Sequence, residues 1–146
     1  MKISTRTRYG TRLLVRLALD HGKGPVLLKD IAAGEGISEK YLGQIIILLK
    51  AKGLVVSFRG AKGGYSLAGD PSVITMKDVV DILEGGIGLV DCQVGPLNCQ
   101  RSSFCVTRDL WADVSKKLAS ALEEVTLKDL ADEFKDKNNN VVMYNI

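Results

Sequence analysis

Three cysteines, Cys92, Cys99 and Cys105, lie within a fourteen-residue stretch, and the chain contains no other cysteine. The loop around them also contains glycine and proline, which lets spaced thiolates converge on one soft metal centre. Iron–sulfur clusters are held mainly by such thiolates, in some proteins with one non-cysteine ligand. A disulfide scheme leaves one thiol over, and structural zinc usually shows a tight C-x2-C pair and four protein ligands. The spacing alone leaves two interpretations open, a metal site and three unrelated thiols.

The chain carries its positive charge at one end. Residues 1–70 have twelve Lys and Arg against five Asp and Glu, a net charge of +7. Residues 71–146 have eight against twelve, a net charge of −4. This asymmetry predicts a basic half that faces a polyanion and an acidic half with another task.

Nothing in the sequence supports export or a membrane span. No apolar signal segment follows Met1, and no run approaches about eighteen apolar residues. We therefore expect a cytoplasmic protein, where cysteines more often bind metal or act in redox chemistry than form structural disulfides. We do not expect an enzyme, because the chain shows no histidine near the cysteines, no phosphate-binding glycine loop and no clear acid–base pair.

The elements that must position these groups begin with helices in the basic half. Apolar spacing and glycine or proline stops predict three of them, at residues 4–21, 27–33 and 38–52. Ser38 is a good N-cap for the third helix, with Ile37 and Leu42 placed as a hydrophobic staple around it. A short helix, a glycine-containing turn and a second capped helix form a helix-turn-helix, whose second helix enters the major groove of DNA.

The third helix carries side chains that suit contacts to DNA. Lys40 fits a phosphate or guanine, and Gln44 fits adenine or a phosphate. Gly43 is unfavourable inside a helix, and it either lets a partner approach the backbone or has no role. Arg8 belongs to a basic stripe along the first helix. The contacts predicted from the helices are made by Arg8, Ser38, Lys40, Tyr41 and Gln44.

A β-hairpin is predicted directly after the third helix. Residues 54–58 and 65–67 resemble strands, and a glycine-rich turn with two basic residues joins them. A basic hairpin tip is usually only a solvated turn, but behind a helix-turn-helix such a hairpin is a wing. Arg59, Gly60 and Lys62 at its tip are expected to meet phosphates or to enter a minor groove.

The acidic half combines the cysteine loop with helices. Thr75 and Thr126 begin capping boxes, and the helices that follow are predicted to end near Leu83 and Phe134. Between them lie a glycine-rich loop at 85–103 and a long helix at 104–124. That helix has coiled-coil spacing typical of a two-fold dimer, although an ordinary core helix is the alternative. The seam consists of Trp111, Val114, Leu118, Ala121 and Val125.

Together these patterns predict a mainly α fold with a small β-hairpin wing. A winged helix-turn-helix DNA-binding domain would occupy residues 1–70, and the cysteine loop with the dimerisation helices would occupy residues 71–146. We expect one compact chain and not two independent domains. The polar tail from residue 135 ends in an apolar segment at 141–144, which is in a position to pack back on the body.

The motifs resemble the Rrf-two family of winged-helix regulators, and the resemblance covers nearly the whole chain. With the three cysteines ahead of Arg108-Asp109-Leu110-Trp111, the chain is most similar to the iron–sulfur cluster regulators of that family, the IscR type. Residues 143–146 are also similar to the cysteine-metabolism members, which lack the cysteines. The other matching segments are residues 1–10, 37–42 and 59–65, together with Ile74-Thr75.

The resemblance implies a homodimeric transcription factor that binds palindromic promoter DNA. It implies an iron–sulfur cluster, [2Fe–2S] in preference to [4Fe–4S], held by Cys92, Cys99 and Cys105 beside the dimerisation helix. Such a protein would sense cluster status and control iron–sulfur biogenesis or related genes. The alternatives are a cluster-free thiol switch of the cysteine-metabolism type and a cluster protein that does not bind DNA.

The chain departs from the family pattern at three positions. Arg108 stands where these regulators often have a ligand histidine, so the fourth ligand would be Asp91, Asp109 or a small exogenous thiol. Arg8 stands where nitric-oxide-sensing relatives can use an acidic residue. Gly43 stands where relatives often have glutamate, so their half-site preference does not transfer.

Overall fold

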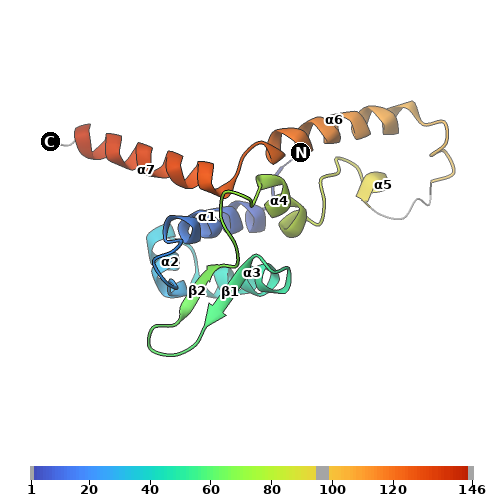
Figure 1. Cartoon of the computed structure of the whole chain (residues 1–146). Coiled ribbons are helices and arrows are strands. Elements are labelled where there is room, and N and C mark those ends of the chain that lie inside the picture. The colour runs from blue at the N-terminus through green and yellow to red at the C-terminus, as the bar shows by residue number, and fades with distance from the viewer. Residues whose placement is uncertain (1, 95–98, 145–146) are drawn as a thin grey trace.

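The computed structural model describes residues 2–94 and 99–144, which form a mainly helical molecule with one β-hairpin (Figure 1). The predicted fold class is confirmed. Residues 95–98 of the predicted cysteine loop and residues 145–146 of the C-terminal motif lie outside the described residues. The elements in chain order are α1 (Thr5–Leu19), α2 (Leu28–Glu35), α3 (Glu39–Ala51), β1 (Val55–Phe58), β2 (Gly64–Leu67), α4 (Met76–Glu84), α5 (Asp91–Val94), α6 (Val106–Glu123) and α7 (Leu127–Tyr144).

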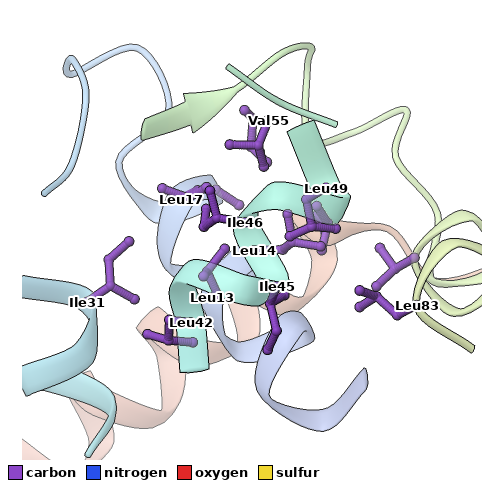
Figure 2. Packing of buried hydrophobic residues seen from close by; sticks show 14 of the residues in the cluster. Leu13, Leu14, Leu17, Ile31, Leu42, Ile45, Ile46, Leu49, Val55 and Leu83 are labelled. Carbon is purple, nitrogen blue, oxygen red and sulfur yellow. The ribbon is translucent and has the colours of Figure 1, made fainter. Parts of the chain in front are cut away.

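The core lies where α1, α3 and α4 pack together. Figure 2 shows buried side chains of the three helices converging there, among them Leu13, Ile45 and Leu83. The apolar residues of α1 and α3 recur at intervals of three and four, so each helix buries one face. Leu127 at the start of α7 is fully buried in the same cluster, which therefore includes residues from both halves of the sequence. The fully buried side chains at its centre include Leu13, Leu14, Leu42, Leu49, Val79 and Leu83.

Side-chain caps begin the helices where the sequence places them. The hydroxyl of Ser38 accepts a hydrogen bond from the backbone N–H of Tyr41 at 3.4 Å. The capping box at Thr75 is present, with Asp78 as its second member. In the box at Thr126, the Thr126 hydroxyl accepts from the N–H of Asp129, and the Asp129 carboxylate accepts from the N–H of Thr126. The predicted N-cap and both capping boxes are confirmed.

The structure differs from the prediction at two helices. The short α5 interrupts the stretch that was expected to be a loop. Helix α7 was expected to end near Phe134, but it continues to Tyr144. Ion pairs one turn apart support this extension, because Lys137 Nζ lies 2.7 Å from Glu133 Oε1 and no glycine or proline interrupts the helix. The apolar end of the chain does not pack on the body, since residues 141–144 are exposed.

The hairpin is antiparallel, with Val55 opposite Leu67 and Phe58 opposite Gly64. Tyr65 also forms two backbone hydrogen bonds with Val26, of 2.8 and 2.9 Å, which attach the hairpin to the segment before α2. Within residues 2–94 and 99–144 no helix is both long enough and apolar enough to cross a membrane.

Candidate nucleic-acid interface and cysteine segment

Helix α3 presents a polar face to solvent opposite the face that it buries. Ser38, Lys40 and Gln44, three of the predicted contacts, are exposed on this face. The turn before it is tight, because Gly36 ends α2 in the left-handed conformation and the N–H of Ile37 donates to the Ala32 carbonyl. Leu42 is fully buried, so the core fixes which face of α3 points outward.

The side chain of Tyr41 is half-buried and packs against α1. Its ring packs edge to face against Tyr9, with ring centroids 5.8 Å apart and planes at 87°. The guanidinium of Arg12 lies over the Tyr9 ring at 5.8 Å from its centroid. Arg12 Nε in turn donates to Glu35 Oε2 at 2.9 Å. This chain of contacts joins α1, α2 and α3 and sets the position of the predicted contact residue Tyr41.

The basic stripe on α1 is partly neutralised within the chain. Arg12 pairs with Glu35, and Arg16 Nε lies 3.9 Å from Asp20 Oδ2. Arg8, the predicted contact, is exposed one turn earlier, near the start of α1. Of the three stripe residues, Arg8 therefore has the cationic group most available for a phosphate.

The tip of the wing has a backbone that only glycine permits. A Cβ on Gly63 would lie 2.4 Å from the carbonyl oxygen of Phe58, and one on Gly64 would lie 2.5 Å from the carbonyl oxygen of Val26. The N–H of Gly63 closes the turn by donating to the Gly60 carbonyl at 3.0 Å. Arg59, Gly60 and Lys62, the predicted wing contacts, are exposed on this tip.

An open cleft of about 510 Å³ separates the start of α3 from the wing. Leu27 and Lys29 line it on the side of α2, Glu39 lines it on α3, and Phe58 and Arg59 line it on the wing. Across this cleft the start of α3 faces the wing, while α3 also packs on β1. A helix with exposed polar side chains and a basic hairpin tip, with a gap between them, suit a duplex, in which a groove lies beside a ridge of phosphates.

The three thiols lie on the connection between α4 and α6. Cys92 is half-buried on α5, Cys99 is exposed, and Cys105 is the half-buried N-cap residue of α6. Among the described residues, no three side chains of the His, Cys, Asp and Glu types are close enough to hold a metal ion. The structure thus does not bring the predicted ligands together. Metal sites of this kind commonly form only as the chain folds around the metal.

The chemistry of the donors fits a soft metal centre. The hydroxyl of Thr107, 3.3 Å from Cys105 Sγ, and then the backbone N–H of Arg108 lower the pKa of the Cys105 thiol below its ordinary value. A lowered thiol pKa favours the thiolate, which is the form that binds metal. Arg108 Nε is buried without a hydrogen-bond partner among the described residues, so a donor is available to an anionic group beside Cys105. Asp91 and Asp109, the predicted fourth ligands, are both exposed.

A glutamine that the sequence analysis did not single out attaches α5 to α6. Gln93 Oε1 accepts from the Ser115 hydroxyl at 3.0 Å and from the backbone N–H of Leu89 at 3.2 Å. Its Nε2 donates to the backbone carbonyl of Arg108 at 3.5 Å. Ser115 is only 7% exposed, although it is polar. The position of Cys92, next to Gln93, is therefore tied to the first turn and the middle of α6.

The sequence contained a weak signal for this contact. Ser115 follows the seam residue Val114, so it falls beside the predicted apolar face of α6 and not on the opposite, solvated face. A polar residue at such a position is usually buried with a partner. The partner itself, twenty-two residues away at Gln93, has no sequence pattern that marks it.

Comparisons with known proteins agree with this geometry. Residues 3–133 match the model of the Rrf2 family, described as an iron-dependent transcriptional regulator. The chain is 42% identical to the protein rrf2 of Nitratidesulfovibrio vulgaris, over 89% of this chain and 87% of the relative. It is 40% identical to the HTH-type transcriptional regulator CymR of Bacillus subtilis, over 90% of each chain. The solved structure of T. potens IscR superposes with a TM-score of 0.77 and 38% identity, over 94% of this chain and 90% of that one.

The agreement in fold with the solved IscR structure extends over most of both chains. The match covers most of the chain, and the relatives are regulators of transcription. The chain belongs to the Rrf2 family of DNA-binding transcriptional regulators.

Proposed function

We propose that this protein acts as a cytoplasmic homodimer that binds palindromic promoter DNA and reports iron–sulfur cluster status through Cys92, Cys99 and Cys105. The observation that supports the proposal is the presence of one exposed cationic surface and one cysteine segment in the same chain. Lys40 and Gln44 on α3 and Arg59 and Lys62 on the wing form the cationic surface. Two copies of α3, one per protomer, would enter successive major grooves about one helical turn apart.

The dimer interface is assigned to the first half of α6. Leu110, Trp111 and Val114 are 52%, 40% and 38% exposed there, although they are large and apolar. Trp111 and Val114 fall on the predicted seam and Leu110 adjoins it. Farther along the seam, Leu118 and Val125 are half-buried and Ala121 is exposed. A second copy packed on this face would remove the exposed apolar surface from water. We therefore assign Leu110, Trp111 and Val114 to the partner, while Val125 at the far end of the seam packs against the core.

The cysteine segment can influence the DNA-binding unit through contacts that already exist. Gln93 ties α5 to α6, and α6 packs on α4, which packs on α1 and α3. A change in the loop between α4 and α6 would therefore alter how α6 meets its partner and how far apart the two wings lie. Three thiolates would hold an iron–sulfur group there, and that group supplies a centre that responds to iron supply and oxidants.

A second candidate is a cluster-free thiol switch in the same architecture. The lowered pKa of the Cys105 thiol and the exposure of Cys99 favour it, because thiolates that solvent can reach are readily oxidised. The similarity to CymR, whose type carries no cluster, points the same way.

Anaerobic purification with quantification of iron and acid-labile sulfide tests the two candidates. A cluster sensor should take up both elements, absorb in the visible range and lose that absorbance in Cys99→Ala. A thiol switch should remain colourless after reconstitution with iron and sulfide, yet change its DNA affinity on oxidation. Binding to duplex DNA that does not weaken steeply with salt would contradict the DNA-binding role in both candidates.

A further inference from the structure

An isoleucine is exposed in the middle of the helix assigned to the major groove. Ile47 on α3 is 70% exposed, whereas its neighbours Ile45 and Ile46 are 1% and 2% exposed. Removing a large aliphatic side chain from water is favourable in free energy, but folding of the chain buries little of the Ile47 side chain. Its place on the outer face of α3 therefore reflects contact with something outside the chain, or no selection at all.

Gly43 lies one turn before Ile47 on the same face of α3. A Cβ at this position would meet only Leu28 Cδ2, at an ordinary contact distance of 3.8 Å. The packing of the chain thus has room for alanine, which also favours helix more than glycine does. The missing side chain leaves the backbone of α3 open to close approach. Gly43 and Ile47 together form an apolar strip.

Polar and cationic groups surround the apolar strip. Lys40 lies one turn before Gly43 and Gln44 lies beside it, both exposed on α3. Arg59 and Lys62 stand on the wing beyond the cleft at the start of α3. The cations Lys40, Arg59 and Lys62 complement phosphates, whereas the exposed Glu39, one turn before Gly43, does not. A polyanion with an apolar group between its phosphates would contact both these cations and the apolar strip. In the major groove the only apolar group on the base edges is the methyl group of thymine.

We propose that Ile47 is a specificity-determining residue that contacts a thymine methyl group, with Gly43 providing the space for the base edge to come close. The inference rests on the proposed function, because it requires α3 to lie in the major groove. The rise of an α-helix puts Ile47 about 10 Å beyond Lys40 along the axis of α3, or about three base pairs along the groove.

Replacement of thymine by deoxyuridine removes only the methyl group, so it isolates the proposed contact. The probe is a duplex selected by the protein from a random pool and long enough for two half-sites one turn apart. Each thymine of a half-site is replaced in turn, and the Kd is measured by fluorescence anisotropy at fixed salt. We expect one position per half-site at which the replacement weakens binding by about fourfold, the effect of burying one methyl-sized group.

Ile47→Ala identifies the side chain that makes the contact. At the sensitive position this variant should bind the thymine and deoxyuridine duplexes equally well, while the wild-type protein still distinguishes them. Val73→Ala is the matched control, because Val73 is 71% exposed, apolar and β-branched, and lies in the segment between the hairpin and α4. The control should retain the wild-type preference.

Gly43→Ala provides a second, independent test. The variant should melt at a temperature about 2–4 °C higher than the wild type, because alanine favours the helix and fits the space. It should nevertheless bind the selected duplex more weakly. A gain in stability with a loss of DNA affinity cannot come from misfolding.

Two results separate this inference from the proposed function. If the wild-type protein binds duplex DNA with steep salt dependence but tolerates deoxyuridine at every position, the inference is overturned and the proposed function stands. If no salt-dependent binding is found, the proposed function itself fails. A shift of the monomer–dimer equilibrium in Ile47→Ala, with the thymine preference intact, would assign Ile47 to a protein interface and would also overturn the inference.

Discussion

The backbone N–H of Ser4 donates a hydrogen bond of 2.8 Å to Glu84 Oε1 and so joins the start of α1 to the end of α4. Ser4 is the N-cap of α1, and Glu84 is the last residue before the glycine pair that opens the cysteine segment. Lys2 and Ile3 also line a pocket of about 450 Å³ with residues 86–89 of that segment. The segment that carries the thiols therefore begins in contact with residues 2–4, at the start of α1.

Lowering the pH should weaken the hydrogen bond between Ser4 and Glu84 and destabilise the protein. Burial alone would raise the pKa of Glu84, but hydrogen bonds from Thr7 and Ser4 outweigh it and hold the pKa below its ordinary value. A lowered pKa in the folded state means that the ionised group stabilises the fold above its unfolded pKa, and that this stability is lost as pH falls through the folded pKa. Urea unfolding at neutral pH and near pH 4 should therefore show a smaller acid-induced loss in Glu84→Gln than in the wild type.

The matched control for this variant is Glu124→Gln. Glu124 is exposed at the end of α6, so its replacement should leave the wild-type acid response unchanged. An equal reduction in both variants would show that net charge, and not the contact with Ser4, governs the response.

Loss of the Gln93 side chain should loosen α5 from α6. Gln93→Ala would leave the buried hydroxyl of Ser115 and the N–H of Leu89 without their acceptor. We expect a loss of about 1–3 kcal/mol in the free energy of unfolding. Trp111, the single tryptophan, lies one turn from Ser115 on α6, so its fluorescence spectrum should shift as the segment detaches.

The exposed Gln100 supplies the comparison for this change. Gln100→Ala should leave both the unfolding free energy and the Trp111 spectrum at wild-type values. A Gln93→Ala protein that matched it on both measures would show that the bonds of Gln93 do not hold α5 in place.

Each cation on the wing should contribute one phosphate contact. In Arg59→Ala or Lys62→Ala, the slope of log Kobs against log salt should become less steep by about one, because one fewer counterion is released. Lys137→Ala removes an equal charge from α7, where Lys137 pairs with Glu133, and should leave the slope unchanged. A slope that changes equally in all three variants would mean that net charge acts without a specific wing contact.

Alanine at Gly63 should distort the wing. The added Cβ would meet the Phe58 carbonyl at 2.4 Å, so the turn would have to open at a cost of about 1–3 kcal/mol. Both thermal stability and DNA affinity should fall. Gly69→Ala adds the same group where nothing lies within 4 Å and should behave as the wild type. A Gly63→Ala protein with normal DNA affinity would show that wing geometry does not matter for binding.

The structures of the helix-turn-helix and of the wing follow from the sequence because their signals are local. Ser38 caps α3 whatever surrounds it, and the spacing of Leu42, Ile45 and Leu49 decides which face of that helix is buried. Once that face is fixed, the exposure of Lys40 and Gln44 follows. The prediction of the wing succeeds for the same reason, since Gly63 and Gly64 occupy backbone positions that a larger residue cannot.

The cysteine segment was less predictable because long-range contacts decide its structure. Helix α5 is four residues long, and no periodicity can mark so short an element. Its contact with α6 depends on Gln93 and Ser115, which are far apart in sequence. The length of α7 was missed because its outer half is exposed and has no periodic buried face, and ion pairs such as Lys137 with Glu133 support it in place of one. The contact between Tyr41 and Tyr9 was also missed because it is long-range, and two aromatic residues on different helices share no local sequence pattern.

The N-cap residues of α4 and α7 lie on adjacent antiparallel backbone segments. Thr75 and Thr126 form an isolated antiparallel bridge, with hydrogen bonds of 2.8 Å from the N–H of Met76 to the Val125 carbonyl and 2.9 Å from the N–H of Leu127 to the Ile74 carbonyl. The chain between α6 and α7 cannot slide without uncapping both helices, so α6 has a fixed pivot at its C-terminal end. Cys105 lies at the opposite end, about 27 Å away. A tilt of α6 by about 10° would carry that cysteine roughly 5 Å and barely disturb the pivot.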